Sequence, residues 1–363
     1  MQDSVEPPKI SLRRMIPTLL SGVALRWSLC RFVPPWAVVT RLLPIVALLM
    51  ACPPGVDTTW DPAYDATDTG WLLSTWSPDG EVRFAVGGEP EAGIVMSDAG
   101  GEWASVATDL DVPLLNWVYG FGADDLWVVG NGGTIIHWDG STWSEVESST
   151  TEDLWGVWGA SPDDLWAVGG SGFPEATATL LRYDGASWST VELPPLERPG
   201  VKALFKVWGT GPSDVFIVGQ RGTLLRWDGS ALREELVGTS DDLISVWGTG
   251  PDRVAVVGGR SNGVISTWDG TEWRTESLSP LPGLNGVWMG ESDTVHVVGI
   301  EGTIAVVDFE SLDYEEALPA TTETFHAVFG DPSERLTAVG GNFASSSGHY
   351  VGIAYERELA GGE

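Results

Sequence analysis

The chain of 363 residues has little cysteine, little histidine and little positive charge. Its 2 cysteines, Cys30 and Cys52, and its 4 histidines form no Cys-x-x-Cys or His-x-His element, so the sequence gives no basis for a disulfide framework or a zinc site. Only 19 Lys and Arg stand against 51 Asp and Glu, a formal net charge of −32. Because non-specific nucleic-acid binding depends on cationic neutralisation of phosphate, we expect no nucleic-acid partner.

A long apolar run at the N-terminus is also missing. The apolar run 42–51 has ten residues, whereas a spanning helix needs about 20. Five arginines precede this run between residues 13 and 41, and Cys52 follows it. A basic region, a short apolar region and a small residue at the cleavage site are typical of a secretory signal.

The end of this signal, Leu49-Met50-Ala51-Cys52, resembles the lipobox of bacterial lipoproteins. The resemblance implies that residues 1–51 are removed and that Cys52 receives a lipid anchor, which would also account for a cysteine without a partner. A plain signal peptide and a retained signal anchor are the alternatives. We expect an exported protein of the cell envelope, at the outer membrane or cell surface rather than the inner membrane. The mature chain would carry 13 basic and 49 acidic residues, a net charge of −36.

An aromatic residue is followed eleven residues later by a glycine seven times in the chain. The pairs are Trp76 and Gly87, Tyr119 and Gly130, Trp158 and Gly169, Trp208 and Gly219, Trp247 and Gly258, Trp288 and Gly299, and Phe329 and Gly340. The period is 39 to 50 residues, which is the signature of a repeat protein.

Each repeat predicts four short antiparallel strands. A large apolar residue stands four positions before the aromatic (Leu154 before Trp158), and this even spacing predicts that both side chains share one face of the first strand. A continuously apolar second strand follows, such as Leu165-Trp166-Ala167-Val168. The third ends in an Asp-Gly hairpin, such as Trp138-Asp139-Gly140, and a fourth opens at Trp143. Helical repeats would need glycine-free amphipathic runs, and the repeat region has none.

These units predict an all-β fold, a seven-bladed β-propeller of four-stranded antiparallel blades over residues 71–358. The last repeat stops at its third strand, and a segment resembling the fourth strand lies near residues 57–64. We therefore expect residues 52–70 to hold a short tether and a strand that completes the last blade, with 359–363 as a C-terminal tail. An incomplete seventh blade is the alternative.

The region 71–358 resembles bacterial secreted and lipoprotein repeat proteins with a Val-Trp-Gly and Trp-Asp-Gly pattern. Val157-Trp158-Gly159 and Trp138-Asp139-Gly140 carry this match. The stretch 98–103, Asp-Ala-Gly-Gly-Glu-Trp, looks like the Asp-box of sialidase-like (BNR) propellers, and there is a distant likeness to propellers of the photosystem II assembly-factor type. The resemblance implies a binding scaffold rather than a reaction.

No catalytic constellation is evident. The chain has no Arg-Ile-Pro stretch, and Arg182, Arg226 and His137 occupy the same position before the third-strand aromatic, so the repeat accounts for them. We expect no enzyme activity, no cofactor and no metal site, although calcium binding by the acidic turns stays open.

Loop enlargements give the candidate binding site. The connection between the second and third strands is enlarged in repeats three and seven, and the link between blades three and four is also long. In a four-stranded antiparallel blade these connections emerge on one face. The candidate residues are Phe173, Pro174, Glu175, Pro195, Arg198, Asn342 and Phe343. Neutral drift of surface loops would explain them equally well.

The sequence thus predicts a monomeric, non-catalytic envelope lipoprotein whose propeller binds a protein or polysaccharide. A glycan-acting enzyme of Asp-box type and a purely structural surface protein are the alternatives.

Overall fold

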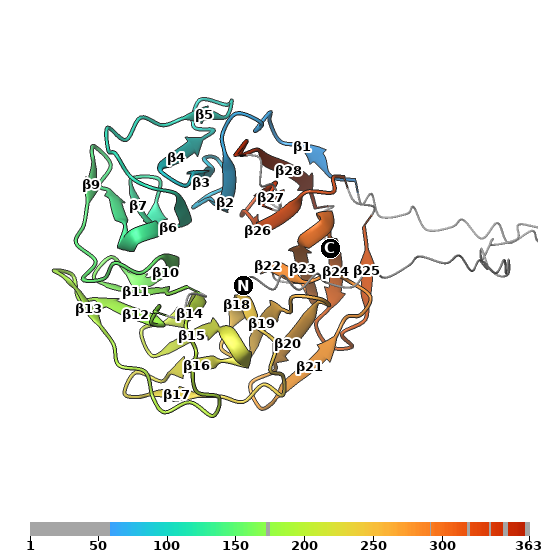
Figure 1. Ribbon diagram of the computed structural model, residues 1–363. Coiled ribbons are helices and arrows are strands. Elements are labelled where there is room, and N and C mark those ends of the chain that lie inside the picture. The colour runs from blue at the N-terminus through green and yellow to red at the C-terminus, as the bar shows by residue number, and fades with distance from the viewer. Residues whose placement is uncertain are drawn as a thin grey trace, which may run out of the picture. The chain divides into compact units, whose positions relative to one another are not determined.

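The computed structural model describes residues 59–171, 175–290, 292–317, 320–333, 335–343 and 348–359. They belong to a compact unit, Gly55–Glu363, in which seven four-stranded antiparallel sheets form a ring (Figure 1). The predicted signal segment, the lipobox and Cys52 lie outside the described residues. The seven-bladed propeller expected from the repeats is confirmed.

Six blades run from an inner to an outer strand in chain order, and in the seventh the outer strand is β1. The first strands are β2 (Trp71–Trp76), β6 (Leu115–Gly122), β10 (Leu154–Ser161), β14 (Leu204–Gly211), β18 (Leu243–Gly250), β22 (Leu284–Met289) and β26 (Thr324–Gly330). The second strands are β3 (Phe84–Glu89), β7 (Asp125–Gly130), β11 (Asp164–Gly169), β15 (Asp214–Gly219), β19 (Arg253–Gly258), β23 (Thr294–Gly299) and β27 (Arg335–Gly341).

The outer half of each blade is shorter. The third strands are β4 (Ala92–Ser97), β8 (Ile135–Trp138), β12 (Thr179–Tyr183), β16 (Leu224–Trp227), β20 (Val264–Trp268), β24 (Ile304–Asp308) and β28 (Gly352–Glu358). The fourth strands are β5 (Ala104–Ser105), β9 (Trp143–Glu145), β13 (Trp188–Thr190), β17 (Leu232–Glu234), β21 (Trp273–Ser277), β25 (Tyr314–Glu316) and β1 (Asp61–Pro62). Three-residue 3-10 helices, η1 (Asn131–Gly133), η2 (Gln220–Gly222) and η3 (Ile300–Gly302), join the second and third strands of three blades.

The ring is closed by the N-terminal strand, as expected. The fourth strand of the last blade is β1, and it pairs antiparallel with β28 through Asp61 opposite Glu356 and Pro62 opposite Tyr355. Trp60, just before β1, is buried against this blade. Closure joins the first and last strands of the propeller in one sheet and covers an edge that would otherwise be exposed.

The repeated glycine at the end of each second strand is required by a close backbone approach. A Cβ on Gly169 would lie 2.1 Å from the carbonyl oxygen of Asp153, the residue just before β10. The same clash, at 1.8 to 2.7 Å with the corresponding carbonyl, recurs at the other six glycines. The glycine eleven residues after the aromatic residue therefore lies where the end of the second strand approaches the start of the first strand of the same blade.

A β-bulge in every first strand changes one expectation from the sequence. In β10, Leu154 pairs with Gly169 and Gly156 pairs with Val168, so Trp155 is an extra residue. Because the bulge breaks the period-two alternation, Leu154 does not share a face with Trp158, contrary to the expectation from their even spacing. The bulged residues of the seven blades are Leu73, Asn116, Trp155, Phe205, Ile244, Asn285 and His326.

Neighbouring blades pack through the aromatic residue of one Trp-Gly step and the glycine of the next. A Cβ on Gly209 would lie 2.8 Å from the indole of Trp158, and one on Gly248 would lie 2.6 Å from the indole of Trp208. The pattern continues between Trp76 and Gly120 and between Trp288 and Gly330. In these motifs the glycine leaves room for the aromatic side chain of the preceding blade, which packs directly against it.

The two faces of the ring are built from different connections. We call the link face the one formed by the connections from second to third strands, such as 131–133, and by the links between blades, such as 191–203. We call the hairpin face the one formed by the turns from first to second strands, such as 162–163, and by the hairpins from third to fourth strands, such as 139–142. Among the described residues no helix is long and apolar enough to cross a membrane.

The close-approach glycines give a stability prediction. Gly169→Ala forces a Cβ against a backbone carbonyl that cannot rotate away, so we expect a loss of about 1–3 kcal/mol or more in the free energy of unfolding. Gly211→Ala is the matched control, because nothing lies within 4 Å of its Cβ position. Urea unfolding of both variants should separate them, and equal stabilities would contradict the close-approach explanation.

Candidate functional site

The enlarged connections all lie on the link face, as the topology of the blades requires. Residues 170–178 join β11 to β12, 342–351 join β27 to β28, and 191–203 link blade three to blade four. Among the predicted residues, Glu175 and Pro195 are exposed and Arg198 is half-buried. Phe173 and Pro174 lie outside the described residues. The enlargements belong to blades three and seven, so they do not form one continuous patch.

The connection in blade seven is anchored to an inner strand. Phe343 is half-buried, with its ring centroid 5.2 Å from that of Trp71 and 5.8 Å from that of His326. Asn342 accepts a hydrogen bond from the Trp71 indole at 2.9 Å and donates one to the carbonyl of His349 at 2.8 Å. Phe343 therefore packs against the inner strands and does not project into solvent.

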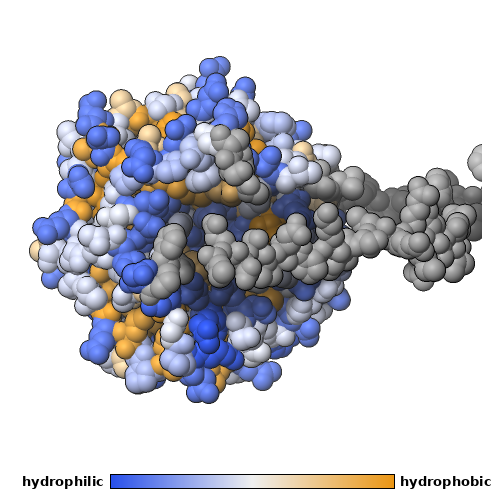
Figure 2. All heavy atoms as spheres, viewed as in Figure 1, coloured by the Kyte–Doolittle hydropathy of each residue, from blue (hydrophilic) through white to orange (hydrophobic). Residues whose placement is uncertain are grey.

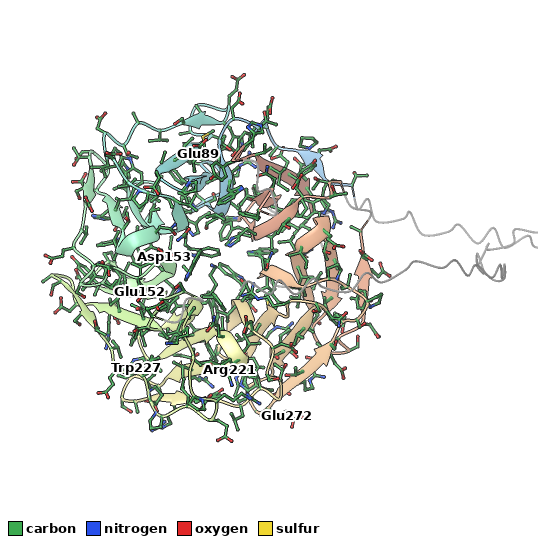
Figure 3. All side chains as sticks on the ribbon, viewed as in Figure 1. Glu89, Glu152, Asp153, Arg221, Trp227 and Glu272 are labelled. Atoms are coloured by element: carbon green, nitrogen blue, oxygen red, sulfur yellow. The ribbon has the colours of Figure 1, made fainter. Side chains whose placement is uncertain are left out.

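The connection in blade three borders a polar groove of about 800 Å³ between blades two and three. Its lining is rich in hydroxyl groups and carboxylates, and includes Thr177, Thr179, Glu147 and Glu152. Glu152 holds the connection in place, because its carboxylate accepts a hydrogen bond from the backbone N–H of Thr177 at 3.2 Å. Figure 3 labels Glu152, which lines this groove, and its neighbour Asp153. Glu272, also labelled there, lies at the periphery of the disc.

The bulged residues of the first strands join neighbouring blades near the link face. Asn116 donates a hydrogen bond to the carbonyl of Leu154 in the next blade, and Asn285 donates one to the carbonyl of Phe325, both at 2.9 Å. His326 contacts the carbonyl of Leu73 through Nδ1 at 2.7 Å, so this nitrogen carries the proton. Burial lowers the pKa of His326 to about 3, and the ring is therefore neutral.

A lysine lies inside the central channel. Lys206, on β14, is 3 % exposed; its Nζ donates a hydrogen bond to the carbonyl of Trp155 at 2.7 Å and lies 4.2 Å from the ring centroid of Trp117. Removal from water disfavours the ammonium form and lowers the pKa of Lys206 to about 7. The repeat pattern gives no signal for this residue, since serine, glycine, alanine and tryptophan occupy the position in other blades.

The channel opens on the hairpin face as an aromatic funnel of about 910 Å³. Its walls include five of the seven repeated aromatic residues, namely Trp76, Tyr119, Trp247, Trp288 and Phe329. Deeper in the channel almost no free volume remains, about 20 Å³. The sequence identified these aromatic residues as repeat markers but did not indicate that they would converge on one cavity.

The Arg and His side chains of the third strands pack and pair within the ring, in agreement with the explanation from the repeat. Arg182 lies 4.9 Å from the ring of Trp166 in its own blade and 5.4 Å from Trp227 in the next, and it forms an ion pair with Asp164 at 2.9 Å. Arg226 has the corresponding neighbours Phe216, Trp268 and Asp214, and His137 stacks on Trp127. These arginines hold blades together and do not converge as a substrate-binding triad.

The aspartates of the Asp-Gly hairpins shape the turns. Asp139 accepts hydrogen bonds from the backbone N–H groups of Ser141 and Thr142 at 2.9 and 2.8 Å. Hydrogen bonds from Ser141 and Thr142 lower the pKa of Asp139 to about 2. Asp308 accepts from residues 310 and 311 in the same way, although the Asp-Gly pair is lost in that repeat. Within the described residues no three His, Cys, Asp or Glu side chains are grouped so that they could hold a metal ion.

The fold and its two faces define a closed seven-bladed propeller with a solvent-open funnel and elaborated loops on opposite sides. No protein-family model and no curated protein matches the sequence. Two similar solved structures are of YCF48. YCF48 bound to a D1 peptide has a TM-score of 0.61 and 17% identity, covering 83% of this chain and 95% of that one. YCF48 from Cyanidioschyzon merolae has a TM-score of 0.62 and 13% identity, covering 82% and 98%.

At these identities the comparison shows the fold alone. It confirms the β-propeller and the expected likeness to propellers of the assembly-factor type.

Lys206 gives a pH-dependent stability prediction. Because the folded pKa of about 7 lies below that of an exposed lysine, about 10.5, the unfolded chain binds more protons between these values. The penalty for burying Lys206 is therefore complete below pH 7 and disappears as the pH approaches 10.5. The free energy of unfolding of Lys206→Met, relative to that of the wild type, should be higher at pH 6.5 than at pH 9.5. The expected difference is on the order of a few kcal/mol, as the difference between the folded and unfolded pKa of Lys206 implies.

Urea unfolding of both proteins at the two pH values measures this difference. Loss of the hydrogen bond to the Trp155 carbonyl adds a constant cost that cancels in the comparison. A stability difference that does not change between pH 6.5 and 9.5 would show that Lys206 keeps an ordinary pKa.

Proposed function

We propose that this protein is a non-catalytic scaffold of the cell envelope that binds a protein partner on its link face. The observation that carries the proposal is that all three enlarged connections lie on that one face. Loops on a rigid scaffold are the usual carriers of recognition. Figure 2 shows hydrophilic side chains around the periphery of the disc, with hydrophobic residues between them.

The anchoring of the enlarged connections supports binding rather than drift. Trp155 donates a hydrogen bond from its indole to the carbonyl of Gly170 at 2.5 Å, at the start of the blade-three connection. Trp71 is bound by Asn342 in blade seven and lies 4.8 Å from the ring of Tyr350. The described ends of both connections are therefore fixed to first strands, and segments that are already fixed lose less entropy on binding.

The link between blades three and four is held in a similar way. Arg198 donates a hydrogen bond to the carbonyl of Arg221 in η2 at 3.4 Å, and the backbone N–H of Glu197 donates to the Glu234 carboxylate at 2.6 Å. Lys202 reaches the carbonyl of Ala176 at 3.0 Å and so ties the link to the blade-three connection. A partner would meet these two segments as one surface.

The known complex of a similar fold supports a protein partner. A YCF48 propeller has been solved with a bound D1 peptide. We extend from that protein only the class of ligand, a polypeptide, and not its identity or its contacts.

The partner surface is tested by crosslinking in native envelopes. We expect the intact protein to capture a partner that is lost when residues 171–176 and 342–347 are shortened. Glu272→Ala, on the exposed β20–β21 hairpin of the hairpin face, is the control and should leave the capture unchanged. Identical captures from the trimmed and intact proteins would contradict a binding role for these loops and favour a structural surface protein.

Envelope anchoring is a second part of the proposal. We infer from the lipobox that Cys52 is acylated. Two or more acyl chains at this residue would attach the protein stably to a membrane. Cys52→Ser should move the protein from the membrane pellet to the soluble fraction and abolish incorporation of radiolabelled fatty acid. Cys30→Ser is the matched control and should leave both unchanged. A Cys52→Ser protein that stays in the membrane would favour a retained signal anchor.

A further inference from the structure

The aromatic funnel on the hairpin face is not part of the proposed partner surface. It has a volume of about 910 Å³, which lies in the range of ligand sites. Blades one, two, five, six and seven all contribute to its lining, and Leu359, after the last strand, also lines it. Among the described residues, the lining contains no Lys or Arg.

The funnel walls offer π surfaces whose polar groups are already bound. Tyr119 donates its hydroxyl to the carbonyl of Gly159 at 3.0 Å, and the Trp247 indole donates to the carbonyl of Met289 at 3.0 Å. The ring of Phe329 stands edge-on to Trp247, with centroids 5.6 Å apart. Tyr119, Trp247 and Phe329 are each only half-buried, so their rings remain accessible. Such walls attract cations through the ring quadrupole.

A buried carboxylate oxygen without a partner lies in the same lining. Asp331 is 4 % exposed, and its Oδ1 accepts hydrogen bonds from the backbone N–H and hydroxyl of Ser333 at 2.8 and 2.5 Å. Its Oδ2 is buried and has no hydrogen-bond partner among the described residues. A buried carboxylate oxygen in that state is costly unless a donor or a cation reaches it.

The turns around the funnel add further negative charge. Exposed aspartates stand on the turns from first to second strands of five other blades, at Asp79, Asp124, Asp163, Asp252 and Asp293. Asp293 is paired with Arg253, and the other four have no ion pair among the described residues. These turn aspartates form a ring that extends beyond the funnel. They can therefore attract a segment that carries several positive charges, and not only a single ion.

We propose that the hairpin face is a second binding site, for a basic segment of a partner protein that inserts one Lys or Arg side chain into the funnel. The aromatic rings hold the cationic group, Asp331 accepts its hydrogen bond, and the aspartates of the turns attract the flanking charges. The site lies opposite the link face and does not depend on the partner proposed there.

The test is fluorescence anisotropy with the full chain and a labelled peptide, Gly-Gly-Arg-Gly-Lys-Gly-Arg-Gly-Gly. A peptide with citrulline and acetyl-lysine at the same positions is the neutral control. We expect the basic peptide to bind about ten-fold more tightly than the neutral one, because cation–π and carboxylate contacts are both lost in the control.

Two variants separate the funnel from general attraction to an acidic face. Asp331→Asn keeps an oxygen for the Ser333 turn but removes the charge, and Phe329→Leu removes a ring and leaves the charge unchanged. Each should weaken the basic peptide about five- to ten-fold. Glu272→Gln, exposed on the β20–β21 hairpin of the same face but outside the funnel lining and the ring of turn aspartates, should change binding less than two-fold.

Three results would overturn the proposal. Equal binding of the basic and neutral peptides would exclude a cation site. Unchanged binding by Phe329→Leu, together with equal losses in Asp331→Asn and Glu272→Gln, would show surface electrostatics without insertion. Tetramethylammonium binding as tightly as the peptide would indicate a small organic cation instead. Thermal unfolding shows whether each variant is folded. If one of Asp331→Asn and Phe329→Leu does not fold, the other alone still tests the proposal.

Discussion

The contact on which this ring depends is that of an aromatic side chain with the glycine of the next blade. The ring of Trp158 lies on Gly209 and that of Trp208 lies on Gly248, so closely that even a methyl group would not fit. Near the link face the bulged residues add a second connection, in which Asn116 and Asn285 donate to carbonyls of the following blade. Because strands pair only within a blade, the last blade has four strands only when β1 pairs with β28, and this pairing completes the ring.

This construction leaves the two faces free for different chemistry. The link face carries long connections that are fixed to first strands, as Asn342 is fixed to Trp71. The hairpin face carries short turns rich in aspartate around a funnel of aromatic rings. The arginines of the third strands, such as Arg182, stack between blades and pair with aspartate, so they stabilise the ring. Rigid blades with variable edges suit a protein that presents surfaces to partners.

Sequence reasoning reached most of the fold but only part of the candidate sites. The pairs of aromatic and glycine predicted the blades, and the missing last strand predicted the closure by β1. The bulge was missed, because Leu154 and Trp158 have the even spacing of a regular strand. Lys206 was missed because it follows no pattern, and Asp331 because its turn looks like the others until burial distinguishes it.

By itself the sequence determined which residues lie on which strand, because glycine and aromatic positions follow from local backbone geometry that recurs in each repeat. It also determined which face the enlarged connections would occupy, since strand order fixes that. Only the tertiary structure decided that five aromatic residues, spread along the chain from Trp76 to Phe329, would surround one funnel. Only the tertiary structure decided, too, that Phe343 would pack on Trp71 and His326. Those contacts depend on how the blades close into a ring, which no single repeat encodes.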